Sequence, residues 1–435
     1  MPKQSVPGQN AEYYLISYDA EGRERTDDPE GVGGALSASI VKALQTSPIT
    51  DVFLLSHGWK GDVPAAIDQY EKWYGAMLGL PDRARAAQVR PGFRPLFIGF
   101  HWPSQPFGNE DQPSGSFDVS SGLAREAWID RAAQGLADTP AARAALGRIL
   151  DAALDELMPD TLSDEVLEAY ATLIAEAGLE AGGLGAAPGD DALGWDVELL
   201  YQDLLEADEV GFGGGLTGGV LAPIRALSFW KMKKRARIVG EAGGAALLAS
   251  VLDAAPAARV HLMGHSFGCV VTTSAVQAAA ATTARRPSTL FLVQGALSLW
   301  SFTDAIPEAP GKPGYFHRVV RDGLVDGPIL TTRSVHDQAV RVLYPMAAGV
   351  AGQVDMAAGA LPKYGGVGTF GARGGGFTHV EEDLRDATAS YALTPGTVYN
   401  LEAAKVIKDG GPPSGAHSDI AKPEVWHAFW EAVLR

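Results

Sequence analysis

The chain has 435 residues, of which 46% are hydrophobic and 20% charged, so it can bury a large core as one domain, with or without an insertion. Acidic residues outnumber basic ones by 52 to 35, which gives a net charge of −17. Such a negative protein repels phosphate backbones and anionic lipids, so we expect neither nucleic acid nor a membrane surface as a partner. The single cysteine, Cys269, excludes an intramolecular disulfide.

The N-terminal segment lacks the apolar core of a signal peptide, and no apolar run approaches the roughly 18 residues of a membrane-spanning helix. We therefore expect a cytoplasmic protein with no membrane span, and the sequence leaves its oligomeric state open. The one dense basic run, residues 231–237, has helical spacing. It is expected to coat a solvated helix face rather than to bind a polyanion.

Short apolar runs alternate with longer amphipathic ones along the chain. This pattern predicts an α/β fold, in which a mostly parallel twisted sheet is flanked by helices. Continuous apolar character in a strand indicates that both faces of the sheet are covered. The predicted strands are 13–19, 51–58, 95–102, 259–266, 289–298, 328–334 and 397–403, and the clearest predicted helices are 65–78 and 424–434.

The strand pattern stops between residues 104 and 221, where acidic, alanine-rich helical segments take over. We interpret this stretch as a helical cap or lid inserted between two parts of one core, 1–103 and 222–435; the alternative is a single long crossover connection. Glycine-rich stretches at 182–191 and 211–219 are expected to act as joints or hinges. A further one, 365–376, is too rich in glycine for regular structure and is expected to be a surface loop.

The segment Gly-His-Ser-Phe-Gly, residues 264–268, lies between a predicted strand and a predicted helix rich in small residues. A sharp turn from strand to helix strains its central residue and needs small neighbours, which Gly264 and Gly268 supply. Ser266 then projects its hydroxyl above the sheet edge. The free amides at the start of the following helix, Phe267 first, can donate hydrogen bonds to a developing oxyanion. This context favours a nucleophile over an ordinary turn.

With this segment and the His-Gly-Trp that follows an earlier strand, the chain resembles an α/β-hydrolase of the serine esterase and lipase type. The resemblance covers most of the chain outside the predicted cap. It implies that the amide of the residue after the His-Gly pair, here Trp59, completes the oxyanion hole. The side chain of His57 is expected to be structural and to pin the loop.

A serine needs a base, and the base needs a partner that fixes its tautomer. The resemblance implies the chain order serine, acid, histidine. His417, in a loop between the last predicted strand and the last predicted helix, is the expected base. Asp337, where a predicted strand meets a helix, is the expected acid, with Asp304 as its rival. The other histidines after Ser266 are expected to lie outside the catalytic set.

Three tryptophans lie just beyond the ends of predicted strands and are candidates for the substrate pocket: Trp59, Trp102 and Trp300. Phe107 and Phe302 are secondary candidates. The expected substrate is a small-molecule ester with an apolar or aromatic group, cleaved through an acyl-serine intermediate. No cofactor or metal is expected, since no motif for either is present. An amidase, thioesterase or acyltransferase would use the same residues, and a binding protein that keeps the fold without turnover is the alternative from another class.

Overall fold

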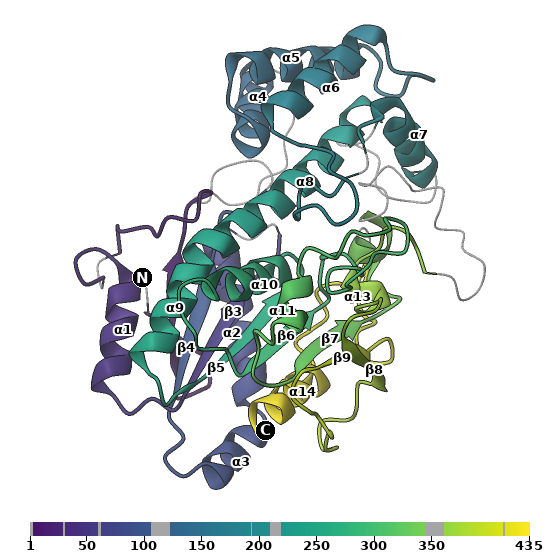
Figure 1. Ribbon diagram of the computed structural model, residues 1–435. Helices are drawn as coiled ribbons and strands as arrows, with labels where there is room; N and C mark the ends of the chain where they lie inside the picture. Colours follow the sequence, from purple (N-terminus) through teal and green to yellow (C-terminus); the bar gives the residue numbers. More distant parts are fainter. Residues whose placement is uncertain are drawn as a thin grey trace.

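A nine-stranded sheet forms the centre of the computed structural model, which describes residues 3–28, 31–59, 62–105, 122–192, 194–208, 219–343, 361–411 and 414–435 (Figure 1). The strand order is β1-β2-β4-β3-β5-β6-β7-β9-β8. Every neighbouring pair is parallel except β1 with β2. The strands are β1 (Lys3–Ser5), β2 (Glu12–Ser17), β3 (Asp51–Ser56), β4 (Pro95–His101), β5 (Arg259–His265), β6 (Thr289–Val293), β7 (Ile329–Arg333), β8 (Thr378–Asp383) and β9 (Thr397–Glu402).

Helices cover both faces of this sheet, so its central strands are apolar at successive positions. In β3, Val52 and Leu54 belong to the core on one face, and Phe53 and Leu55 belong to the core on the other. The helices packed on the first core include α1 (Leu36–Thr46), α8 (Ala222–Val239), α9 (Ala245–Ala254) and α10 (Gly268–Ala279). Those on the second are α2 (Val63–Leu78), α3 (Asp82–Val89) and α14 (Pro423–Val433). The prediction of a mostly parallel sheet flanked by helices is confirmed.

All seven predicted strands are present, and the two that the sequence pattern missed lie at the sheet edges. β1 has only three residues, and β8 leaves most of its side chains exposed. An edge strand pairs on one side only and can be largely solvated, so it need not carry an apolar pattern. Among the helices of the described residues, none is both long and apolar enough to cross a membrane.

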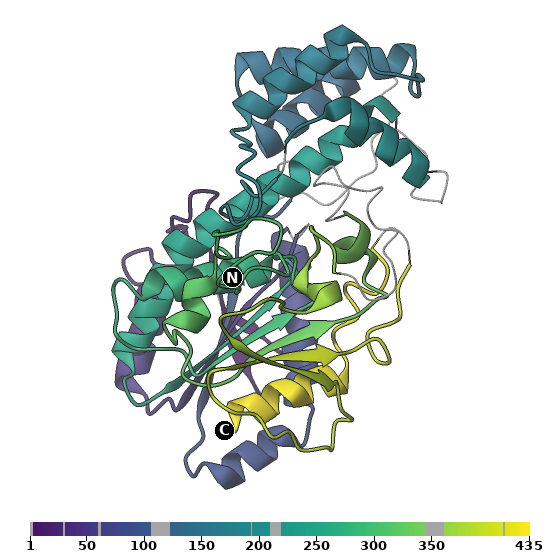
Figure 2. The ribbon, with the colours of Figure 1, turned by 45° about the vertical axis from the view of Figure 1, so that its right-hand side comes forward.

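A block of helices lies beyond the carboxyl ends of the strands, above the sheet in Figures 1 and 2. It consists of α4 (Gly122–Leu136), α5 (Pro140–Asp155), α6 (Asp164–Glu176) and α7 (Val197–Asp208). All four fall within the stretch predicted to be an insertion. Helix α8 then runs from this helical block down to the sheet, where it packs against α10. One long helix therefore joins the block to the core.

The basic run of α8 does not coat a solvated face, so that prediction is wrong. Nζ of Lys233 is buried 2.6 Å from a carboxylate oxygen of Asp191, and Nζ of Lys234 is 2.7 Å from one of Asp190. Gly189 has a φ of 96°, and a Cβ there would collide with Lys234. The run thus neutralises the acidic end of the glycine-rich loop that was expected to be a joint. That loop is packed on α8, and most of the other expected joint lies outside the described residues.

The glycine-rich stretch after residue 364 is a surface loop only in its second half. Its first half includes the short helix α13 (Val367–Phe370) and is mostly buried. The backbone of this half forms hydrogen bonds with residues that follow neighbouring strands. The Gly368 amide donates to the Gly295 carbonyl at 2.9 Å, and the Gly368 carbonyl accepts from the Ser334 amide at 2.9 Å. Side chains would obstruct this close approach, since a Cβ on Gly368 would lie 2.7 Å from the backbone of Gln294. The glycines serve buried packing as well as flexibility.

Candidate active site

Ser266 stands on a strained turn between β5 and α10. Its φ of 57° lies in the left-handed region, where few non-glycine residues are found. The two flanking glycines permit the turn, as predicted, for a steric reason. A Cβ on Gly264 would collide with the backbone of Gly268, and one on Gly268 would collide with the carbonyl of Ser56. Strand, turn and helix therefore pack so closely that only glycine fits on either side of the serine.

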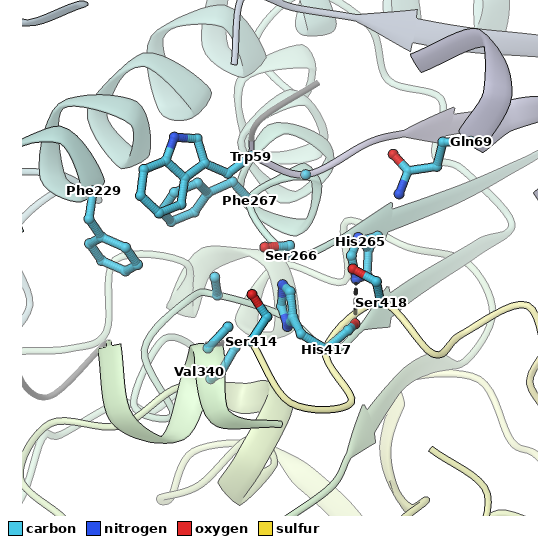
Figure 3. A pocket seen from close by; sticks show the side chains of 13 residues that line it. Trp59, Gln69, Phe229, His265, Ser266, Phe267, Val340, Ser414, His417 and Ser418 are labelled. Atoms are coloured by element: carbon cyan, nitrogen blue, oxygen red, sulfur yellow. Dashed lines mark hydrogen bonds between the residues drawn. The ribbon is translucent and has the colours of Figure 1, made fainter. Parts of the chain in front are cut away.

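A cavity of about 220 Å³ opens beside Ser266 (Figure 3). One side is apolar and largely aromatic, and the other carries amide, hydroxyl and imidazole groups. The lining residues are Gly58, Trp59, Gln69, Phe229, His265, Ser266, Phe267, Ala296, Ala339, Val340, Ser414, His417 and Ser418. Most come from strand ends and the segments that follow them, Gln69 comes from α2 and Phe229 from α8. The helix that carries the helical block thus forms part of the cavity wall.

His417 and Asp337 form a hydrogen-bonded pair at this cavity. Nδ1 of His417 lies 2.8 Å from Oδ2 of Asp337, which is fully buried. A carboxylate oxygen accepts, so Nδ1 carries the proton and Nε2 remains available as a base. In Figure 3 the His417 ring points toward Ser266, and both residues line the cavity. The structure therefore brings together the serine, the histidine and the preferred acid.

Two loops at neighbouring strand ends hold the pair. Asp337 follows β7, and His417 lies between β9 and α14. The Ala416 amide donates to the His336 carbonyl at 2.9 Å, and the backbones of Asp337 and Gly415 form an isolated antiparallel β-bridge. Because β7 and β9 are adjacent and parallel, these loops emerge at the same edge of the sheet.

Gln294 is a contact of Asp337 that sequence reasoning missed. Its Nε2 donates to Oδ2 of Asp337 at 2.8 Å, while the Val340 amide donates to Oδ1 at 2.9 Å. With the bond from His417, the buried carboxylate accepts three hydrogen bonds, which fix its orientation. A glutamine after an apolar strand carries no sequence signal for this contact.

Trp59 and Phe267, the two residues expected to supply oxyanion amides, both lie beside Ser266 at the cavity. Phe267 is the last residue before α10, and a backbone amide at this position of a helix has no intrahelical carbonyl to bond to. Trp59 follows Gly58, where an added Cβ would lie 2.6 Å from Cβ of Ser266. The loop after β3 therefore approaches the serine closely because it carries a glycine there.

His57 supports this loop from below. Its Nδ1 donates to the Gly58 carbonyl at 2.8 Å, so its Nε2 accepts from Nδ1 of His101, also at 2.8 Å. Burial and the neighbouring His101 lower the pKa of His57 to about 3. Trp102 stacks on the His57 ring, with centroids 5.8 Å apart, and its indole donates to the His57 carbonyl at 3.1 Å. His57 is a neutral structural residue, in line with its expected role.

Of the three tryptophans expected at the pocket, Trp59 lines this cavity, whereas Trp102 and Trp300 do not. Trp102 is fully buried beneath the loop after β3, and Trp300 is buried with its indole bonded to the Lys363 carbonyl at 3.0 Å. Their wall positions are taken by Trp59, Phe229 and Phe267. Strand ends are readable in a sequence, but the direction of a side chain there is not. Of the secondary candidates, Phe302 is buried in the core and Phe107 lies outside the described residues.

His265 is a second contact that the sequence did not reveal. Its Nε2 donates to the His417 carbonyl at 2.9 Å, so His417 is held through its own backbone (Figure 3). Nδ1 of His265 is buried without a hydrogen-bond partner. Burial, together with the nearby His417, lowers the pKa of His265 to about 3. This imidazole stays neutral and acts as a fixed donor.

A separate cluster of Asp82, His427 and Glu431 has the residue types of a metal site. Both ring nitrogens of His427 are already bonded, at 2.9 Å to Asp82 and at 2.8 Å to the Ala389 carbonyl. Glu431 pairs with Arg85. These contacts satisfy the cluster internally, and they fasten α14 to α3.

Comparison of the chain with protein-family models, with curated proteins and with solved structures gives no match. The chemistry of the site is therefore inferred from its own residues. A strained serine, Ser266, lines the cavity with His417, Trp59 and Phe267, and the imidazole of His417 is bonded to the buried carboxylate of Asp337.

Proposed function

We propose that this protein is a serine hydrolase that cleaves carboxylic esters, with Ser266 as nucleophile, His417 as base and Asp337 as the acid that orients it. The observation that carries the proposal is the hydrogen bond between His417 and Asp337 at the cavity where Ser266 stands on its strained turn. A hydroxyl, an imidazole and a buried carboxylate in this relation are the parts of a nucleophilic triad.

In the proposed reaction, Oγ of Ser266 attacks the ester carbonyl carbon and gives its proton to Nε2 of His417. Asp337 accepts the Nδ1–H bond throughout and stabilises the imidazolium. The tetrahedral oxyanion accepts from the amides of Trp59 and Phe267. When the intermediate collapses, the carbon–oxygen bond to the alcohol breaks and His417 protonates the leaving oxygen. Water then attacks the acyl-serine by the same route, which releases the acid and returns the proton to Ser266.

The proposal extends to the fold, since the chain resembles the α/β-hydrolases in several independent places. The serine follows a central strand, the second oxyanion amide follows an earlier strand, and the order along the chain is Ser266, Asp337, His417. On this interpretation the helical block is a cap over the carboxyl edge of the sheet. Phe229 supports it, because it brings α8 into the cavity wall.

The cavity favours a compact ester with one apolar or aromatic group. Trp59, Phe229 and Phe267 form a continuous aromatic wall, with ring centroids 4.9 to 6.1 Å apart. The volume of about 220 Å³ lies below the roughly 300 to 1,000 Å³ of typical small-molecule pockets, which favours a ring or a short chain over a long acyl group. Gln69, Ser414 and Ser418 provide polar contacts opposite this wall.

The test is hydrolysis of a panel of esters of graded acyl length by the purified protein, beside the thioester and the anilide of one acyl group. We expect ester cleavage that Ser266→Ala lowers on the order of a million-fold while the variant stays folded. Ser274→Ala is the matched control, since that buried serine lies on the same helix but not at the cavity. A Ser266→Ala variant that keeps a tenth of the activity would exclude Ser266 as nucleophile. Faster thioester or anilide cleavage would reassign the substrate class and leave the triad in place.

A further inference from the structure

Gln294 and Ser266 share an unusual backbone. Among the described residues they are the two non-glycine positions with positive φ, 47° for Gln294 and 57° for Ser266. They directly follow the adjacent parallel strands β6 and β5. Such a conformation is unfavourable for a residue with a Cβ and persists where the surroundings impose it, often at functional sites. A glycine would adopt it without strain, so the glutamine side chain itself calls for an explanation.

The side-chain amide of Gln294 is fixed by hydrogen bonds at both its oxygen and its nitrogen. Oγ1 of Thr332 donates to Oε1 at 2.9 Å, and the same hydroxyl accepts from the Gln294 backbone amide at 2.9 Å. Nε2 is therefore directed at Oδ2 of Asp337, 2.8 Å away, with a longer bond of 3.3 Å to the Gly368 carbonyl. The side chain is fully buried and does not line the cavity. Its strained backbone places a fixed donor on the carboxylate and leaves it no contact with substrate.

We propose that Gln294 is a positioning residue for the triad, which fixes Oδ2 of Asp337 where it accepts the Nδ1–H of His417. This inference rests on the proposed function. Oδ2 accepts from both Gln294 and His417, so the two bonds lock the carboxylate rotation that the imidazole needs. Without Gln294, a buried charge loses a donor and the carboxylate can turn away from His417. The effect falls on proton transfer and leaves substrate binding unchanged.

The experiment compares Gln294→Met and Gln294→Glu with the unchanged protein by steady-state kinetics on its best ester. Gln294→Met removes the donor at similar volume, and we expect kcat to fall about tenfold to a hundredfold with KM unchanged, the range of a lost hydrogen bond to a charged group. Thr331→Val is the matched control. It removes a buried hydroxyl on β7, next to Thr332, that donates to Asn400 and not to Gln294, and it should leave kcat unchanged.

Gln294→Glu adds a pH signature that a purely structural role would not give. When the new carboxyl at position 294 is protonated it can still donate to Asp337, whereas the ionised form repels it, so the two carboxyls retain one proton to unusually high pH. Three other titratable groups lie near the carboxyls at positions 294 and 337: His417, His265, which bonds to the His417 carbonyl, and Cys269, whose thiol lies near Gly295. Burial keeps His265 neutral and raises the pKa of the Cys269 thiol. We therefore expect kcat of Gln294→Glu to fall at high pH, where the shared proton is lost. The kcat of the unchanged protein should stay constant over the same pH range.

Equal kcat in all of these proteins, or a rise in KM alone, would overturn the positioning role and leave the proposed function intact if Ser266→Ala is inactive. Loss of activity in Thr331→Val equal to that in Gln294→Met would also overturn it, since core packing would then explain both. If no ester is cleaved, the proposed function fails, and the proton resonance of His417 Nδ1–H still tests the contact. That resonance should shift in Gln294→Met, and an unchanged signal would contradict the inference. Should the Gln294 variants not fold, Thr332→Val, which frees the amide to turn, should lower kcat several-fold.

Discussion

Nδ1 of His417 lies 2.8 Å from Oδ2 of Asp337, although the two residues are 80 positions apart in the chain. The adjacent strands β7 and β9 bring their loops together, and the bridge between Asp337 and Gly415 sets their register. Asp304, the other candidate acid, is exposed and packs against Gly376 on the second half of the glycine-rich stretch. The geometry therefore separates two aspartates that the sequence pattern could only rank.

Asp337→Asn should lower kcat about ten-thousand-fold, as expected when an amide replaces the carboxylate that orients a catalytic histidine. Asp304→Asn, the matched control, should keep kcat within a few-fold of the unchanged protein. Ester hydrolysis and thermal unfolding of both variants check this. A larger loss in Asp304→Asn than in Asp337→Asn would move the acid to the loop after β6.

Phe229→Ala should change which esters fit, because Phe229 packs against Phe267 at 4.9 Å and forms part of the aromatic wall. We expect kcat/KM for larger acyl groups relative to smaller ones to rise roughly tenfold, the scale of a methylene or two in an apolar pocket. Labelling of Ser266 by a small probe should persist. Leu199→Ala, an exposed position on α7, is the control. An unchanged order of substrates would show that α8 does not shape the binding site.

Ser266→Gly should be more stable than Ser266→Ala by about 1 kcal/mol, because the left-handed φ at this position strains any residue with a Cβ. Unfolding by urea measures the difference. At Ser274, within helix α10, the same comparison should have the opposite sign, with glycine less stable than alanine by about 1 kcal/mol. The same sign at both positions would mean that the turn is not strained.

Stability should fall as pH is lowered from about 6.5, because burial lowers the pKa of His57 and of His265 to about 3. In the unfolded chain these two imidazoles are protonated below about pH 6.5, whereas in the native protein they stay neutral down to about pH 3. Each of the two histidines therefore lowers the free energy of unfolding by about 1.4 kcal/mol for every pH unit below about 6.5. His427 acts in the opposite sense. Burial lowers its pKa, but the hydrogen bonds to Asp82 and the Ala389 carbonyl, with the charges of Asp82 and Glu431, together outweigh burial and raise it.

Urea unfolding at pH 7, 6 and 5 measures this slope. His265→Gln keeps a donor for the His417 carbonyl and should reduce the slope by about one proton. A variant with the same slope as the unchanged protein would show that His265 is protonated in the native state.

The centre of the fold is readable from the sequence because its strands are buried on both faces. β3 is apolar from Val52 to Leu55 for that reason, whereas β8 contacts one neighbour and solvent and carries Thr-His-Val-Glu-Glu-Asp. The glycine pattern around Ser266 is readable too, because strand and helix cross there at backbone distance. In both cases the constraint acts on residues close together in the chain, so it is visible as a short sequence pattern.

Contacts set by tertiary packing leave no such pattern. The left-handed φ of Gln294 and the bond from His265 to a carbonyl 152 positions away depend on how separate loops meet. Lys233 and Lys234 belong to a basic run that is typical of a solvated helix face. In the fold they are instead paired with Asp191 and Asp190 of a loop that packs on the helix. Charge runs are therefore weak guides where an acidic segment can fold back on them.

An activated serine at position 266 is tested most directly by reaction with a fluorophosphonate, followed by mass spectrometry of the labelled peptide. We predict fast, stoichiometric labelling on Ser266, loss of that label in Ser266→Ala, and strong slowing in Asp337→Asn. No labelling of the folded protein, or labelling at another serine that persists in Ser266→Ala, would contradict the triad of Ser266, His417 and Asp337.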